Sequence, residues 1–179
     1  MRRVLYLLGQ LSDENIEWMI AQGKRENIPA GTVLIEEGKP SALVYIVLDG
    51  LLGIFVKAGR DENLIAQRGA GEILGEMSFI DDSPPTATVK TLEPSILFTL
   101  PKTTLADHLE ENRDFAARFY RGIAVSLSYR LRESMERSAP GTSMGGEVNE
   151  DEELDATVLD SVYLAGMRFD RIVRRMMET

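Results

Sequence analysis

Residues 71–89 contain the strongest candidate for binding chemistry in the sequence. Gly71 and Gly75 bracket a short apolar step, Glu76 opens a stretch typical of a brief helix, and two acids followed by two prolines end it. A helical turn that starts at a glycine directs backbone N–H groups and a partial positive charge at whatever lies before it, which favours a phosphate. A tight turn between strands, in which glycine supplies a positive φ, explains the same residues equally well.

Both halves of this segment resemble the phosphate-binding cassette of cyclic nucleotide-binding domains. The family pattern is Gly-Glu with small or apolar residues, then a short gap, then Pro-Arg, a small residue and Ala-Thr-Val. The matching positions are Gly75, Glu76, Met77 and Ser78 in the first half and Pro84, Thr86, Ala87, Thr88 and Val89 in the second. The match fails at Pro85, where the family carries the arginine that pairs with the cyclic phosphate. The resemblance therefore implies the fold more firmly than the ligand.

The resemblance implies a site for a small anion, with cyclic AMP (cAMP) or cyclic GMP (cGMP) as the candidates. The residues of this site are Gly75, Glu76, Met77, Ser78, Pro85, Thr86 and Ala87. The N–H groups near Met77 and Ser78 would face a phosphate, and Glu76 would accept a hydrogen bond from a ribose 2′-hydroxyl. Thr86 and Ala87 would line the anionic end. For Glu76, an acid that satisfies the dipole at a helix N-terminus is a compatible alternative.

Proline at position 85 removes a charge and a donor from the expected site. An arginine would form charge-assisted hydrogen bonds worth about 1.5–3 kcal/mol each, whereas Pro84 and Pro85 have no backbone N–H. Arg68 and Lys90 lie close to the cassette in sequence, but strand alternation does not show that either points inward. We therefore expect the chain to bind cAMP or cGMP weakly or not at all.

No residue pattern predicts catalysis. His108 is the only histidine and lies among acids on an expected helix surface, without a serine or metal-ligand companion in the sequence. The pairs Asp81-Asp82 and Glu36-Glu37 lie in turns, where acids are common for turn chemistry alone. There is no cysteine for a thiolate metal site or a thiol nucleophile. We expect a protein that is not an enzyme and has no metal site.

Charge and composition limit the classes of partner. With 20 basic and 29 acidic residues the net charge is −9, which repels a nucleic-acid backbone. The apolar run after Arg2-Arg3 is too short for a signal peptide or a membrane span. We expect a cytoplasmic protein that binds neither DNA nor a membrane, and the sequence names no protein target.

Short strands must position the expected site. Turn clusters of Gly, Pro and Asp recur about every ten residues from Ile28 onward and separate runs rich in Val, Ile, Leu and Tyr. The predicted strands are 32–35, 43–48, 51–56, 63–67, 86–91 and 95–100. The run Val44–Leu48 is apolar on both faces, which predicts the centre of a sandwich, and Asp49-Gly50 after it is a hairpin signal. A helix capped by Ser12 and ending near Gly23 precedes the strands.

This order of motifs is similar to the cyclic nucleotide-binding family from about Leu8 to Arg132. The resemblance implies a mainly β fold with flanking helices, an antiparallel jelly-roll β-barrel. A short N-terminal helix, a long C-terminal helix and a separate tail helix complete it. We expect residues 8–136 to form this domain together with its long helix.

Helical spacing begins after Pro101 and gives two apolar stripes. One stripe is Phe115, Phe119 and Ile123, and the other is Ala117, Tyr120, Ala124, Leu127 and Leu131. Stripes of this kind are most often core, but a long helix on a small barrel leaves one face uncovered. We predict a homodimer through the helix around Tyr120 to Leu131.

Composition changes again after the long helix. Residues 137–153 are rich in Gly, Ser and acids and are predicted to be a flexible acidic linker. Residues 154–178 carry apolar side chains at spacings of three and four and are predicted to be an amphipathic helix. The helix begins with acids and ends with arginines, as its dipole favours.

Two functions remain open. The first is a regulatory sensor domain for signal transduction, in which a small anionic ligand, with a cyclic nucleotide as the candidate, shifts the C-terminal helices. The second is a dimerisation or protein-interaction module that keeps the fold but has lost nucleotide binding. Gly75-Glu76 favours the first function, and Pro85 favours the second.

Overall fold

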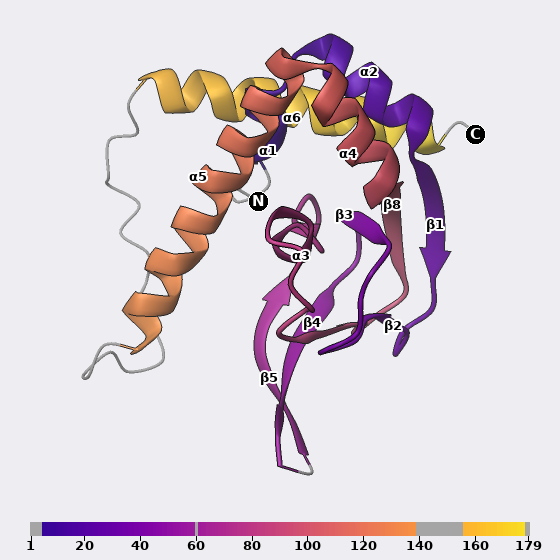
Figure 1. Cartoon of the computed structure of the whole chain (residues 1–179), viewed down its shortest axis with the longest axis vertical. Helices are drawn as coiled ribbons and strands as arrows, with labels where there is room; N and C mark the ends of the chain where they lie inside the picture. Colours follow the sequence, from indigo (N-terminus) through magenta and orange to yellow (C-terminus); the bar gives the residue numbers. More distant parts are fainter. Residues whose placement is uncertain (1–4, 60, 139–155, 178–179) are drawn as a thin grey trace.

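The computed structural model describes residues 5–59, 61–138 and 156–177. Within these residues, the strands form two four-stranded antiparallel sheets. One sheet has the order β1-β8-β3-β6 and the other β2-β7-β4-β5. The strands are β1 Lys24–Ile28, β2 Val33–Ile35, β3 Leu43–Asp49, β4 Leu52–Ala58, β5 Asp61–Arg68, β6 Ile73–Leu74, β7 Thr88–Thr91 and β8 Ser95–Pro101. The jelly-roll fold predicted from the sequence is confirmed, as two facing sheets (Figure 1).

Helices precede, interrupt and follow the strands. They are α1 Leu5–Gln10, α2 Asp13–Gln22, α3 Met77–Ile80, α4 Lys102–Glu111, α5 Arg113–Ser138 and α6 Ala156–Met177. The predicted cap of α2 is present, since Ser12 Oγ accepts from Asn15 N at 3.3 Å and Asn15 Oδ1 accepts from Ser12 N at 2.9 Å. None of the described helices has the length and apolarity that crossing a bilayer requires.

Strand β3 occupies the centre of the core, as its apolar sequence predicts. Every residue from Val44 to Leu48 is at most 7% exposed. Tyr45 and Val47 pack in the cluster between the two sheets, whereas Ile46 packs in the cluster beneath the helices. Because successive side chains of a strand point to opposite faces, a strand buried on both faces needs a continuous apolar run.

The Asp49-Gly50 turn does not close a hairpin, which corrects the prediction made for it. Strands β3 and β4 belong to different sheets, so the turn carries the chain from one sheet to the other. Gly50 has a φ of 100°, and an added Cβ would lie 2.3 Å from Ser95 Oγ. The Asp49-Gly50 sequence therefore reflects the requirement for glycine at a sharp corner. It does not indicate that the two flanking strands pair with each other.

The helical stretch after Pro101 is divided in two at Asn112, a break that the sequence reading did not include. Asn112 Oδ1 accepts a hydrogen bond from Phe115 N at 2.9 Å, so its side chain caps the start of α5. Gly122 lies inside α5, where an added Cβ would be 2.8 Å from the Cα of Leu7. The absence of a side chain at Gly122 thus allows α1 and α5 to approach closely.

The predicted amphipathic tail helix is present as α6 and lies along α1 and α2 (Figure 1). Ala165 and Ile172 are fully buried and Met176 is 7% exposed, in the same cluster as Leu7 and Leu8. Its apolar stripe therefore belongs to the main core. The predicted linker, residues 137–153, lies outside the described residues from position 139 onward.

Polar contacts of Arg168 attach α6 to the N-terminal helices. Arg168 Nη1 donates to the carbonyl oxygens of Leu8 and Gly9, each at 3.1 Å, and Nε donates to Asp13 Oδ1 at 3.0 Å. The carbonyls are among those left without intrahelical partners at the end of α1. The hydrogen bond from Arg168 lowers the pKa of the Asp13 carboxyl, against a small opposing effect of burial.

Candidate functional site

The turn before α3 depends on two glycines in the left-handed region. Gly71 has a φ of 77° and Gly75 a φ of 84°. An added Cβ at Gly75 would lie 2.8 Å from the carbonyl oxygen of Leu43, so a side chain there would collide with β3. The two-residue strand β6 runs between the glycines and pairs with β3. The glycines predicted from the sequence therefore set the path of residues 71–89, called the cassette segment below.

Helix α3 begins directly after Glu76, whose carboxylate is buried at 3% exposure. Ser78 Oγ accepts a hydrogen bond from Lys102 Nζ at 2.7 Å. Burial lowers the pKa of Lys102, and the carboxylates of Glu76 and Asp82 oppose this shift. Asp82, just after α3, has a φ of 52°, which short acidic side chains tolerate in turns.

A cavity of about 590 Å³ lies between the cassette segment, the second sheet and α5. It is lined by all seven residues predicted from the sequence, which are Gly75, Glu76, Met77, Ser78, Pro85, Thr86 and Ala87. Its other lining residues are Ile35, Ile54, Ile65, Arg68, Leu74, Val89, Leu127, Arg130, Leu131 and Ser134. The volume is within the range of roughly 300–1,000 Å³ typical of small-molecule sites.

Arg130 of α5 holds the carboxylate that the resemblance assigns to a ribose. Arg130 Nη1 donates to Glu76 Oε1, and Nη2 donates to Glu72 Oε2 at 3.1 Å and to the carbonyl oxygen of Ile73 at 2.7 Å. Within the described part of the chain, the buried Nε of Arg130 has no hydrogen-bond partner. The pairing satisfies a buried carboxylate that would otherwise be costly.

Arg68 and Lys90, the two cations near the cassette segment in sequence, point to different places. Arg68 lines the cavity with its side chain 10% exposed, and its Nε lies 3.8 Å from Glu72 Oε2. Lys90 instead pairs with Glu62 and lies 5.1 Å from the ring centroid of Phe55. The strand register shifts in the β4–β5 pair, so alternation along β5 could not place Arg68.

Sequence reasoning missed Arg130 because it followed the apolar stripe of α5 alone. A signal was present, since Arg130 lies three residues after Leu127 and directly before Leu131, both of which line the cavity. An arginine within an apolar stripe is unusual on a surface that packs against another element. Its partners, however, lie more than fifty positions away in the sequence.

His108 is not an exposed helix residue, which corrects the expectation from sequence. Its ring stacks on Trp18 with centroids 3.8 Å apart and an interplanar angle of 8°, and Phe115 lies 4.9 Å away. The histidine therefore packs in an aromatic cluster where α2, α4 and α5 meet. Among the described residues, no three His, Cys, Asp or Glu side chains are grouped so as to hold a metal ion.

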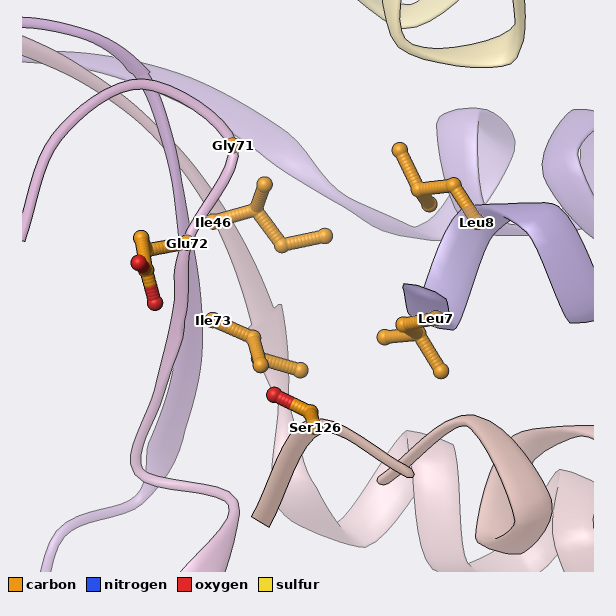
Figure 2. A pocket seen from close by; sticks show the side chains of 7 residues that line it. All are labelled: Leu7, Leu8, Ile46, Gly71, Glu72, Ile73 and Ser126. Atoms are coloured by element: carbon orange, nitrogen blue, oxygen red, sulfur yellow. The ribbon is translucent and has the colours of Figure 1, made fainter. Parts of the chain in front are cut away.

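A second, much smaller void of about 10 Å³ lies between α1, β3, β6 and α5. Figure 2 shows Ile46 and Ile73 directed toward Leu7 and Leu8, with the Glu72 carboxylate directed to the other side of the backbone. A volume of this size accommodates at most about one water molecule. The void is a packing gap, and the large cavity is the candidate binding site.

Comparisons with known proteins agree with the fold. The family described as "Cyclic nucleotide-binding domain" matches residues 25–112. Potassium channel KAT1 of Oryza sativa subsp. japonica is 29% identical over 133 residues, which cover 74% of this chain and 18% of the channel. The chain thus spans less than a fifth of the length of that relative.

Two solved structures are similar in three dimensions. A cyclic nucleotide-binding domain from Methylobacillus flagellatus KT has a TM-score of 0.70 and 25% identity, covering 82% of this chain and 85% of that one. The regulatory domain of Toxoplasma gondii PKA, solved with cAMP, has a TM-score of 0.55 and 27% identity, covering 59% of this chain and 42% of that one. Residues 25–112 match this family, and the two facing sheets with their flanking helices have the jelly-roll fold of the cyclic nucleotide-binding type.

Proposed function

We propose that this chain is a non-catalytic regulatory domain that binds a small organic anion between the cassette segment and α5. The observation that carries the proposal is that the seven residues predicted from the sequence line one cavity of about 590 Å³. A cyclic nucleotide such as cAMP or cGMP is one candidate, because the related PKA domain was solved with cAMP.

The ligand would act on the C-terminal helices through α5. Leu127, Arg130 and Leu131 of α5 line the cavity, so an occupant of the cavity contacts this helix directly. Helix α5 crosses α1 closely at Gly122, and α6 packs against α1. A ligand that binds one position of α5 more tightly than another would shift the equilibrium between the two positions by the difference in binding free energy. The packing of α1 and α6 would change together with the position of α5.

Retention of a ligand and response to nucleotides test the proposal. The purified full chain would be examined by native mass spectrometry for a retained molecule, and then titrated with cAMP and cGMP while its melting temperature is followed. A bound ligand raises the melting temperature in proportion to the logarithm of its concentration above Kd. The variant Ala87→Trp, which fills the cavity, should lose both the retained molecule and the response.

An interaction module without a ligand is the second candidate. It is favoured by Pro85, which offers no charge or N–H to a phosphate, and by the Arg130–Glu76 pair, which already uses the Glu76 carboxylate. This candidate predicts no retained molecule, no response to either nucleotide, and an Ala87→Trp variant that is indistinguishable from the unmodified chain. Those three results together would replace the sensor proposal.

A further inference from the structure

We infer that Arg68 and Arg130 form the anion subsite of the cavity, and that its ligand is an organic monoanion with a large apolar body. The inference rests on the proposed function, since it assigns a ligand class to the same cavity. It also moves the anion away from position 85, where the cassette segment has no cation.

The hydrogen-bond donors on the cavity wall suit an anion. Among the described residues that line it, the charged side chains are Arg68, Arg130 and Glu76, and Glu72, which does not line it, pairs with both arginines. The Arg68 side chain is 10% exposed and that of Arg130 is 18% exposed. Charges held this far from bulk water interact more strongly with a ligand than surface charges do.

Glu72 holds the two arginines close together. The same carboxylate oxygen, Glu72 Oε2, lies 3.1 Å from Arg130 Nη2 and 3.8 Å from Arg68 Nε. Glu72 itself is not among the residues that line the cavity. One carboxylate therefore fixes two guanidinium groups beside each other at the edge of the cavity. Two guanidinium groups placed in this way can donate paired hydrogen bonds to the oxygens of a carboxylate, sulfonate or phosphate.

The remaining wall requires an apolar ligand body. It consists largely of the aliphatic side chains of Ile35, Ile54, Ile65, Leu74, Val89, Leu127 and Leu131. Pro85 adds an apolar ring at the position of the family's arginine. A ligand gains from this wall in proportion to the apolar area it buries. The cavity thus combines one cationic end with an aliphatic interior.

Two fluorescent probes with nearly the same body test the inference on the unmodified full chain. 8-Anilinonaphthalene-1-sulfonate carries one negative charge, and N-phenyl-1-naphthylamine lacks the sulfonate. We expect the sulfonate probe to bind at least about tenfold more tightly, because charge-assisted hydrogen bonds to arginine are available only to it. The Ala87→Trp variant should lose both probes, which locates them in the cavity.

Variants then assign the preference to the two arginines. Arg68→Met and Arg130→Met should each lower the ratio of sulfonate-probe affinity to neutral-probe affinity about tenfold. Arg68→Lys, which keeps the charge, should retain most of the preference for the sulfonate probe over the neutral probe. It also tests the role of the charge if Arg68→Met fails to fold. The matched control is Lys90→Met, since Lys90 pairs with Glu62 and does not line the cavity.

The outcomes separate the two proposals. If both probes bind, both are lost in Ala87→Trp, and their affinities are equal, then the arginine subsite is wrong and the ligand cavity stands. The same conclusion follows if the sulfonate preference survives in both methionine variants. If neither probe binds, or if Ala87→Trp binds both unchanged, this inference is overturned, and the retained molecule and the response to cAMP and cGMP decide the proposed function separately.

Discussion

Glu76 and Arg130 form an ion pair that joins the cassette segment to α5 across 54 positions of sequence. The Glu76 side chain is 3% exposed and that of Arg130 is 18% exposed, so the pair is largely removed from water. Since Arg130 also donates to Glu72 and to the carbonyl of Ile73, one side chain attaches α5 to the edge of the cavity. These contacts join α5 to the segment that lines the cavity.

Replacing Arg130 should destabilise the fold. Arg130→Met leaves the buried Glu76 carboxylate without its cation, which costs about 3 kcal/mol in comparable cases. The double variant Arg130→Met/Glu76→Gln should recover part of that loss, because the uncompensated charge is then absent. Urea unfolding of the unmodified chain, both single variants and the double variant measures the coupling. Strictly additive free energies would contradict the pairing.

Introducing an arginine at position 85, where the resemblance places one, should strengthen cAMP binding. Pro85 lines the cavity, and its carbonyl accepts from Gly38 N at 2.8 Å, a contact that arginine can keep. One or two charge-assisted hydrogen bonds should raise affinity for cAMP by at least about tenfold in Pro85→Arg, measured by calorimetry. Pro84→Arg, next to it and outside the cavity lining, is the control. Equal affinities for the unmodified chain and Pro85→Arg would show that position 85 does not face the nucleotide.

The predicted dimer can be tested on the exposed end of α5. Phe115, Phe119 and Ile123 are buried, whereas Leu131 is 62% exposed and Met135 is 65% exposed. Leu131→Lys/Met135→Lys should give a folded monomer in sedimentation, because these side chains add little to the core. Tyr163→Lys/Met167→Lys on α6 has the same spacing and similar exposure, and it should stay dimeric. The reverse result would place the contact on α6.

Two glycines in helices offer a matched pair for stability. Gly122→Ala would bring a Cβ within 2.8 Å of the Leu7 backbone, so we expect a loss of about 1–3 kcal/mol from overpacking. Gly166→Ala meets nothing within 4 Å and should gain up to about 1 kcal/mol from helix propensity. Thermal or urea unfolding of the two variants gives the sign. A gain in Gly122→Ala would mean that α1 does not pack there.

Acid should weaken the attachment of α6 to α2. The Asp13 pKa is lowered below 3.8 in the folded chain by the hydrogen bond from Arg168. A lowered pKa gives stability that is present above about pH 3.8 and lost as pH falls through the lower folded value. Because the Asp13 side chain is 60% exposed, the effect should stay below about 1 kcal/mol and shrink with salt.

The measurement for Asp13 compares unfolding of the unmodified chain with that of Asp13→Asn at pH 7 and at about pH 3. The difference in the free energy of unfolding should be larger at pH 7. In an Arg168→Gln background, Asp13→Asn should have a smaller effect, since the hydrogen bond is already missing. A difference that persists unchanged in that background would exclude Arg168 as the cause.

Local patterns in the sequence account for most of the strands. Turn spacing and apolar runs predicted strands at 43–48 and 95–100, and the structure has β3 at Leu43–Asp49 and β8 at Ser95–Pro101. Strand β1, Lys24–Ile28, was missed because it is a charged edge strand whose partner, β8, supplies the pairing. Helix α1 was missed because it is short and depends on α5 and α6 for its packing.

The cavity was predictable only in part. The cassette residues follow one another in sequence and share a local pattern, so their gathering on one wall could be foreseen. Arg68 could not be placed, since a register shift in the β4–β5 pair interrupts the alternation. Arg130 reaches the cavity only through the docking of α5, a tertiary arrangement that helical periodicity does not encode.

The contact of Arg168 with α1 has a consequence for how the protein is made. During synthesis α1 emerges before α6, because the arginine that binds the Leu8 carbonyl follows 160 positions later. Until α6 emerges, the apolar surface that Ala165 and Ile172 cover on α1 has no partner from that helix. Chaperones and proteases recognise such surface, so chains that end before α6 should be distinguished from chains that contain it by the state of α1.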